Sequence, residues 1–117
     1  MNNSEVTKNL FDTIIKLGGR NTSENYMKLV LETVIKRDDS MKLLESVKLG
    51  DVIKPSSSLD QMDSKELGGA LNKLVGEIAG IAGDQTGKDA FLKEISCYIG
   101  QASLIKLKNM GVNILFK

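Results

Sequence analysis

The chain has 117 residues, enough for one domain with a hydrophobic core but close to the size at which subunit association often adds stability. Its 16 basic and 15 acidic residues give a net charge of +1 and are spread over both halves, which argues against a nucleic-acid-binding protein with a concentrated positive field. One cysteine and no histidine exclude an intramolecular disulfide and leave no histidine–cysteine cage for a metal ion.

The sequence also favours a cytoplasmic protein. It opens without a charged-then-apolar signal segment, it has no apolar run of about 18 residues, and its last residues carry no lipidation motif. A single cysteine suits a reducing compartment. We therefore expect no membrane partner.

Two amphipathic helices are predicted first. One begins near the capping residue Ser4 and ends at Gly18-Gly19, a pair that suits a helix stop. The other follows the capping residues 21–24 and carries Lys36-Arg37 in its last turn, where positive charge complements the helix dipole. The apolar side of the first helix is formed by Val6, Leu10, Ile14 and Leu17. The apolar side of the second is formed by Tyr26, Val30, Thr33 and Val34, widened by Met27, Leu31 and Ile35.

A third, shorter helical pattern begins at residues 38–40 and completes the N-terminal helices, residues 1–49. Residues 50–62 break the helical period and are predicted to be a connecting loop. Within that loop residues 51–54 are β-prone, as are residues 112–116 near the other end of the chain. We interpret these two segments as candidates for a minor two-stranded ribbon beside the helices.

Residues 63–117 are predicted to form the centre of the fold, a hairpin of two long helices joined by a loop at 83–88. In the first of these helices apolar residues recur at four- and three-residue steps and so face a core: Leu67, Leu71, Leu74, Ile78 and Ile81. The opposite side carries almost no side chains, because it is formed by four glycines: Gly69, Gly76, Gly80 and Gly83. Because an interior glycine costs a helix about 1 kcal/mol relative to alanine, we interpret these glycines as a place where another helix packs closely. The alternative is that the helix ends near Val75 and the glycines are loop.

The second long helix of the hairpin is predicted to run from the loop to Gly111, a glycine that suits a helix stop. One of its stripes would pack inside the hairpin: Phe91, Ile95, Tyr98, Ala102 and Ile105. The other stripe is formed by Cys97, Gly100, Leu104 and Leu107. Because an exposed apolar stripe usually marks an interaction surface, we predict that this second stripe is a homodimer interface. The alternative is that the N-terminal helices cover it within one chain.

The loop at 83–89 contains the glycines, Thr86 and Lys88 that a phosphate-binding loop would use. It departs from that pattern at Ala82 and Asp89, and it follows a helix rather than a strand. We therefore interpret it as the stop of one helix and the start of the next. If it binds an anion, Gly87 and Lys88 are the expected contacts.

Catalytic chemistry is not favoured by any residue pattern. Asp63 and Glu66 have the spacing of a helix capping box, and Cys97 lacks a histidine to activate it. No cofactor is expected. The few aromatic residues and the five methionines are interpreted as core, although methionines can also line an adaptable ligand pocket.

The sequence thus predicts a single, mainly α-helical domain, a small bundle around a C-terminal helical hairpin. The expected function is a non-enzymatic, self-associating regulatory or scaffold module that acts through helix–helix contacts, as a homodimer or with another protein partner. The alternative is a sensor domain that binds a small apolar or anionic ligand between helices. A weaker alternative is a nucleic-acid-binding regulator that uses the basic C-terminal end, with Lys93, Lys106, Lys108 and Lys117.

Overall fold

The computed structural model describes residues 1–20, 22–82 and 87–114 and confirms a mainly α-helical bundle with a minor two-stranded ribbon. The helices are α1 (Asn3–Gly18), α2 (Glu24–Arg37), the 3₁₀ helices η1 (Asp39–Ser46) and η2 (Ser57–Gln61), α3 (Ser64–Ala82), α4 (Lys88–Tyr98) and α5 (Gln101–Asn109). The strands are β1 (Lys48–Leu49) and β2 (Ile53–Lys54).

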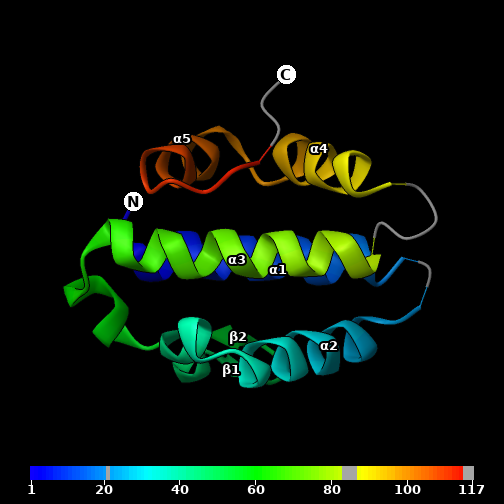
Figure 1. Cartoon of the computed structure of the whole chain (residues 1–117), viewed down its shortest axis with the longest axis horizontal. Coiled ribbons are helices and arrows are strands. Elements are labelled where there is room, and N and C mark those ends of the chain that lie inside the picture. The colour runs from blue at the N-terminus through cyan, green and yellow to red at the C-terminus, as the bar shows by residue number, and fades with distance from the viewer. Residues whose placement is uncertain (21, 83–86, 115–117) are drawn as a thin grey trace.

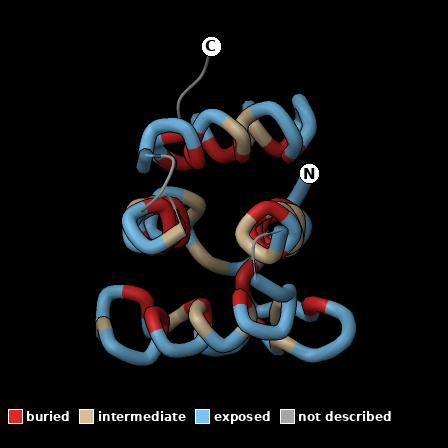
Figure 2. The backbone as a smooth tube through the Cα atoms, turned by 90° about the vertical axis from the view of Figure 1, so that its right-hand side faces the viewer, coloured by how far each residue is buried: buried red, intermediate tan, exposed pale blue. Residues whose placement is uncertain are grey.

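The elements form three layers (Figure 1). Helices α1 and α3 lie side by side in the middle layer, with α4 and α5 on one side of them and α2, η1 and the ribbon on the other (Figures 1 and 2). Buried residues line the inward sides of both outer layers (Figure 2). The core is therefore one continuous cluster to which every layer contributes.

Helix α1 shares the centre of the fold with α3. It contacts α2, α3, α4, α5, η2 and β2, so its buried side chains cover a wide arc of the helix. Two of those buried residues are polar, Asn3 and Thr7. The Asn3 amide donates to the carbonyls of Leu59 and Met62 at 3.0 and 3.1 Å, and its oxygen accepts from Ser64. Asn3 thus joins the start of α1 to the end of η2 and the start of α3.

The predicted ends of the first two helices are confirmed except at the start of α1. Helix α1 ends at Gly18, and the Ser23 side chain caps α2 by accepting from the Tyr26 amide. The cap of α1 is Asn2 rather than Ser4. Asn2 and Glu5 form a reciprocal capping box, in which each side chain accepts from the other's backbone amide. The third pattern is the 3₁₀ helix η1, capped by Asp38.

The ribbon pairs different segments from those predicted. Strands β1 and β2 pair with each other, Lys48 beside Lys54 and Leu49 beside Ile53. A three-residue loop separates these strands, so they meet without closing a long segment of chain. Val112 and Ile114 are buried in the core instead of pairing with residues 51–54, and residues 115–117 lie outside the described part of the chain.

The second long helix of the predicted hairpin is divided in two. Gly100 has a φ of 95°, a left-handed conformation that interrupts the helix between α4 and α5. Because the break turns the chain, the apolar period does not carry through to Ala102 and Ile105, which are exposed. Within α4, Phe91 and Ile95 are buried, but Tyr98 at its end is exposed. The second half of the predicted inner stripe is therefore wrong.

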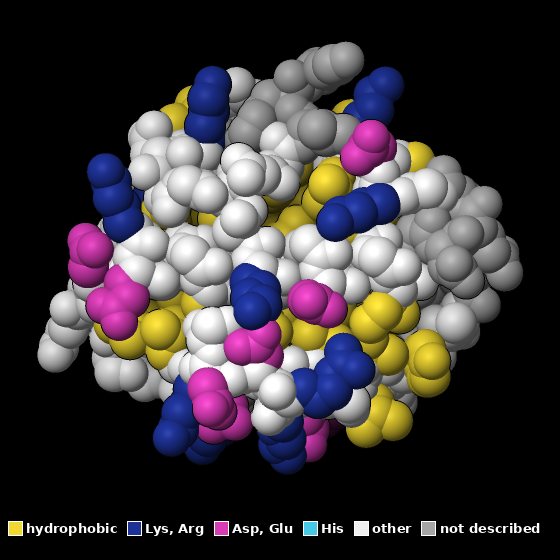
Figure 3. Space-filling model, in the orientation of Figure 1, with side chains coloured by type: hydrophobic (Ala, Val, Ile, Leu, Met, Phe, Trp, Pro, Cys, Tyr) yellow, Lys and Arg dark blue, Asp and Glu magenta, His cyan; other side chains and the backbone are white. Residues whose placement is uncertain are grey.

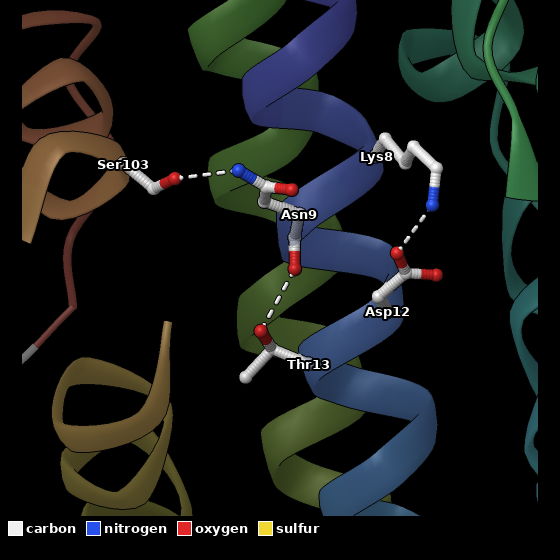
Figure 4. A network of polar contacts seen from close by, with 5 residues as sticks. All are labelled: Lys8, Asn9, Asp12, Thr13 and Ser103. Carbon is white, nitrogen blue, oxygen red and sulfur yellow. Dashed lines mark hydrogen bonds and ion pairs between the residues drawn. The ribbon is translucent and has the colours of Figure 1, made fainter. Parts of the chain in front are cut away.

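Helix α5 is fixed to α1 by a polar contact inside the bundle (Figure 4). The Asn9 amide donates to the buried Ser103 hydroxyl at 2.9 Å, and the Thr13 hydroxyl donates to the Asn9 carbonyl at 2.8 Å. An ion pair between Lys8 and Asp12 lies on another side of the same helix, at 2.6 Å (Figure 4). The Asn9–Ser103 bond lies on the face that α5 turns towards the core, the face that also buries Leu107.

Candidate interaction surface

The predicted homodimer stripe does not form one surface. Leu107 is fully buried inside the chain and Leu104 packs against the core, whereas Cys97 and Gly100 are exposed. The break at Gly100 explains the difference, because residues before and after it no longer follow one helical period. The expectation that these four residues share an exposed seam is wrong.

The predicted glycine packing is also corrected. Helix α3 continues past Val75 to Ala82, so Gly69, Gly76 and Gly80 are helical as expected. Within the described chain, however, no atom would lie within 4 Å of a Cβ added at any of them, beyond their own helix and chain neighbours. We call these three residues the glycine ridge. Gly83, the fourth predicted member, lies outside the described residues.

The close contact of α3 is made by a different glycine, Gly68. A Cβ at Gly68 would overlap the carbonyl oxygen of Met110, just after α5. The sequence shows two adjacent glycines here, Gly68-Gly69. The helical period predicts that Gly69 lies opposite the core, but it does not indicate that Gly68 makes a close contact.

The structure does not test the predicted anion contacts, Gly87 and Lys88. Gly87 has a φ of 96° directly before α4, and Lys88 is the exposed first residue of that helix. Residues 83–86, which would complete the loop, lie outside the described part of the chain. Anion binding by Gly87 and Lys88 therefore stays a prediction.

A group of exposed apolar side chains lies between α2 and the end of α3. Tyr26, Leu29 and Ile81 are 51%, 60% and 44% exposed. Together with their neighbours they line a groove of about 290 Å³. We call this surface the α2–α3 patch; it comprises Tyr26, Leu29, Val30, Thr33 and Ile81. Figure 3 shows the apolar side chains gathered at the lower right of the face, over α2 and the end of α3.

The α2–α3 patch arises because the apolar arc of α2 is wider than the core can cover. Helix α2 buries Met27, Leu31, Val34 and Ile35. Tyr26 and Leu29 lie outside that arc and point away from the core. The prediction that Tyr26 belongs to the core is wrong, and Leu29 was not identified because it falls outside the expected apolar side.

Four charged residues of alternating sign lie beside the patch. Asp38, directly after α2, pairs with Lys73 on α3 at 2.6 Å. Arg37, Asp38 and Glu77 line a neighbouring hollow of about 280 Å³. We call Arg37, Asp38, Lys73 and Glu77 the charge cluster. Figure 3 shows Lys or Arg side chains alternating with Asp or Glu side chains near the middle of this face.

The pairing within the charge cluster changes the acidity of its members. The Lys73 ammonium, followed by the hydroxyl and backbone amide of Ser40, lowers the pKa of Asp38 from 3.8 to about 2. The same hydrogen bond and the charge of Asp38 raise the pKa of Lys73, with a smaller contribution from Glu77. Both groups therefore stay charged at neutral pH.

Exposed apolar residues elsewhere are more scattered. On α4, Tyr98 is exposed but lies under the Arg20 guanidinium, 5.0 Å from the ring centre, and Arg20 also pairs with Glu94 at 2.9 Å. Val52 is exposed in the loop between the strands. The α2–α3 patch is thus the described surface where exposed apolar side chains share one groove.

A second groove, of about 330 Å³, lies between α2, η1 and β1. Its apolar lining is Ile35, Leu44, Val47 and Leu49. Glu32, Lys36, Glu45 and Lys48 provide its charged lining. The groove combines an apolar surface with charges of both signs.

No helix among the described residues has both the length and the apolar character needed to cross a membrane. A scan against protein-family models and searches of curated proteins and of solved structures found no match to this chain.

Proposed function

We propose that this chain is a non-enzymatic, self-associating regulatory or scaffold module that acts through helix contacts at the α2–α3 patch. The observation that carries the proposal is the exposure of three large apolar side chains, Tyr26, Leu29 and Ile81, along one groove. Apolar groups gathered in this way usually mark an interaction surface, whereas single exposed apolar residues are ordinary.

Burial of the patch supplies a driving force for association. Covering a large apolar side chain contributes about 1.5–3 kcal/mol when the whole side chain is transferred from water. Each of the three residues is about half exposed, so each contributes on the order of 1 kcal/mol when covered. A two-fold contact uses such a surface twice, once from each copy.

The test is the mass of the protein in solution over a range of concentrations, measured by light scattering. We expect the wild-type mass to rise from the 12.8 kDa of one chain towards twice that value. Leu29→Glu should remain at the mass of one chain, because it places a charge in the patch. Its fold should be kept, since Leu29 is 60% exposed, and circular dichroism checks this.

Val52→Glu is the matched control. Val52 is 56% exposed but lies in the loop between the strands, so its substitution should leave association unchanged. The proposal is contradicted by a wild-type protein that keeps the mass of one chain at every concentration. Equal loss of association in both variants would also contradict it.

A second candidate function is the binding of a small apolar or anionic ligand in the groove between α2, η1 and β1. The specific observation is the apolar lining, which suits a small apolar molecule. Because Lys36 pairs with Glu32 at 2.9 Å, Lys48 is the lining residue expected to contact an anionic group. Native mass spectrometry distinguishes the two functions. Additional mass on a single chain supports a ligand, and multiples of the bare chain mass support self-association.

A further inference from the structure

The charge cluster has an arrangement that is complementary to itself. Lys73 and Glu77 are one helical turn apart on the exposed side of α3. Asp38 pairs with Lys73, and Arg37 lines the same hollow as Glu77. The four charges therefore alternate in sign both along α3 and across from α3 to the end of α2.

A two-fold axis that runs between two copies of α3, perpendicular to both helices and level with Val75, would bring unlike charges together. In an antiparallel pair of α3 helices with this axis, position 73 of one copy faces position 77 of the other, so Lys73 meets Glu77 twice. At the end of α2, Asp38 lies beside Lys73 and Arg37 shares a hollow with Glu77, so the same axis would bring Arg37 of one copy towards Asp38 of the other. A shift of one helical turn along α3 would instead bring like charges together, which is costly.

The glycine ridge allows the two helices to approach. It lies on the exposed side of α3 together with Lys73 and Glu77, and space is open beyond each of its three glycines. In the antiparallel pair, position 69 of one copy is level with position 81 of the other along the helices, so the exposed Ile81 of each copy lies beside the bare Gly69 end of the partner's ridge. The end of the α2–α3 patch would thereby be covered.

We infer that the α2–α3 face binds a second copy of this chain, with the two α3 helices antiparallel about a two-fold axis near Val75. This inference rests on the self-association proposed above and adds its geometry. The partner copy supplies the opposite charges at the centre and places the bare Gly69 end of its ridge beside Ile81.

Cysteine crosslinking tests the position of the axis. In a Cys97→Ser background, Gly76→Cys places a thiol close to the axis, because the two copies of position 76 are only about 3 Å apart along the helices. Gly69→Cys is the matched control on the same ridge, since its two copies are about 18 Å apart along the helices. Both sites have room for the side chain. Under mild oxidation, Gly76→Cys should give a disulfide-linked dimer at least about tenfold faster than Gly69→Cys.

A mixture of Gly69→Cys and Ile81→Cys chains should crosslink to each other, because those positions are at the same level along the two antiparallel helices. Equal crosslinking of the Gly76 and Gly69 variants would overturn the inference. So would no crosslinking of the Gly76 variant while the wild-type protein associates, because the contact between the two copies would then lie elsewhere. If the wild-type protein associates but the Gly76 variant does not crosslink, the proposed self-association stands and only its geometry is wrong. A wild-type protein that keeps the mass of one chain overturns both the proposed function and this inference.

Charge exchange provides an independent test of the same register. Lys73→Glu and Glu77→Lys should each weaken self-association at least about tenfold, because like charges then face one another. An equal mixture of the two variants should recover association, since one chain now carries two negative and the other two positive charges at these positions. Circular dichroism checks that both variants are folded. If two folded variants do not associate when they are mixed, the register is contradicted.

Discussion

The two sides of α3 differ in what they contact. On the closed side, three residues spaced by four hold distant segments: Ser64 donates to Asn3, Gly68 lies against Met110, and Asn72 accepts from the Asn113 amide at 2.7 Å. On the open side, the glycine ridge has no described neighbour close to its Cβ positions, and Lys73 pairs with Asp38.

This difference shows that the role of a glycine depends on its neighbour in space rather than on its place in a helical period. Gly68 and Gly69 are adjacent, yet a side chain at Gly68 would overlap backbone whereas one at Gly69 would enter open space. The glycine ridge lowers the helix propensity of α3 without improving packing inside the chain. In the proposed dimer, close approach of two α3 helices would offset that cost.

The largest expected effect comes from Gly68→Ala on the closed side. Its methyl group would overlap the Met110 carbonyl, and backbone cannot move as easily as a flexible side chain. We expect a loss of about 3 kcal/mol or more in the free energy of unfolding, measured by denaturant titration. Gly69→Ala is the matched control and should gain up to about 1 kcal/mol, because alanine favours the helix and nothing obstructs it. Similar changes in both variants would contradict the comparison.

A smaller effect is expected from Asn3→Ala. The substitution leaves the carbonyls of Leu59 and Met62 and the Ser64 hydroxyl without their common partner. We expect a loss of about 2 kcal/mol in the free energy of unfolding, because buried polar groups without partners are costly. Asn9→Ala removes one amide–hydroxyl bond, to Ser103, and should cost about 1 kcal/mol. An equal or smaller loss for Asn3→Ala would mean that Asn3 does not join the three segments as described.

The smallest expected effect concerns the open side and depends on pH. Because the pKa of Asp38 is lowered from 3.8 to about 2, its ionised form stabilises the folded chain above about pH 4, and this contribution disappears as the pH falls towards 2. Asp38→Asn keeps an oxygen that can cap η1 but removes the charge. The stability difference between wild type and variant should therefore shrink between pH 4 and pH 2 in thermal unfolding scans. A stability difference that stays constant over that pH range would show that the Asp38–Lys73 pair does not stabilise the folded chain.

Sequence patterns predicted local features well and contacts between distant segments poorly. The stop at Gly18-Gly19, the cap at Ser23 and the core stripe from Leu67 to Ile78 each depend on residues within a few turns, and the structure confirms them. The last predicted member of that stripe, Ile81, is exposed instead, so its assignment to the core is wrong. The break at Gly100 was missed because apolar residues continue at helical spacing on both sides of it. Its left-handed φ cannot be read from that spacing.

The candidate surface was missed for a related reason. The apolar arc of α2 is broader than one partner can cover, and the sequence does not say which part of it remains exposed. Tyr26 and Leu29 are exposed because α1, α3 and η1 pack against the other side of the helix. The buried role of Asn3 was hidden too, since a polar residue near the start of a helix ordinarily suggests a cap.

The contact between Asn9 and Ser103 also bears on the order in which the chain can fold. The two residues are 94 positions apart, so α1 cannot complete its packing until α5 has been made. At a synthesis rate of about 5–20 residues per second, roughly 5–20 s pass between the two helices. During that interval α1, which is made first, carries apolar side chains that have no α5 to cover them, and closing so long a segment is a slow step even for the finished chain. Nascent chains would therefore be most prone to aggregation before α5 emerges.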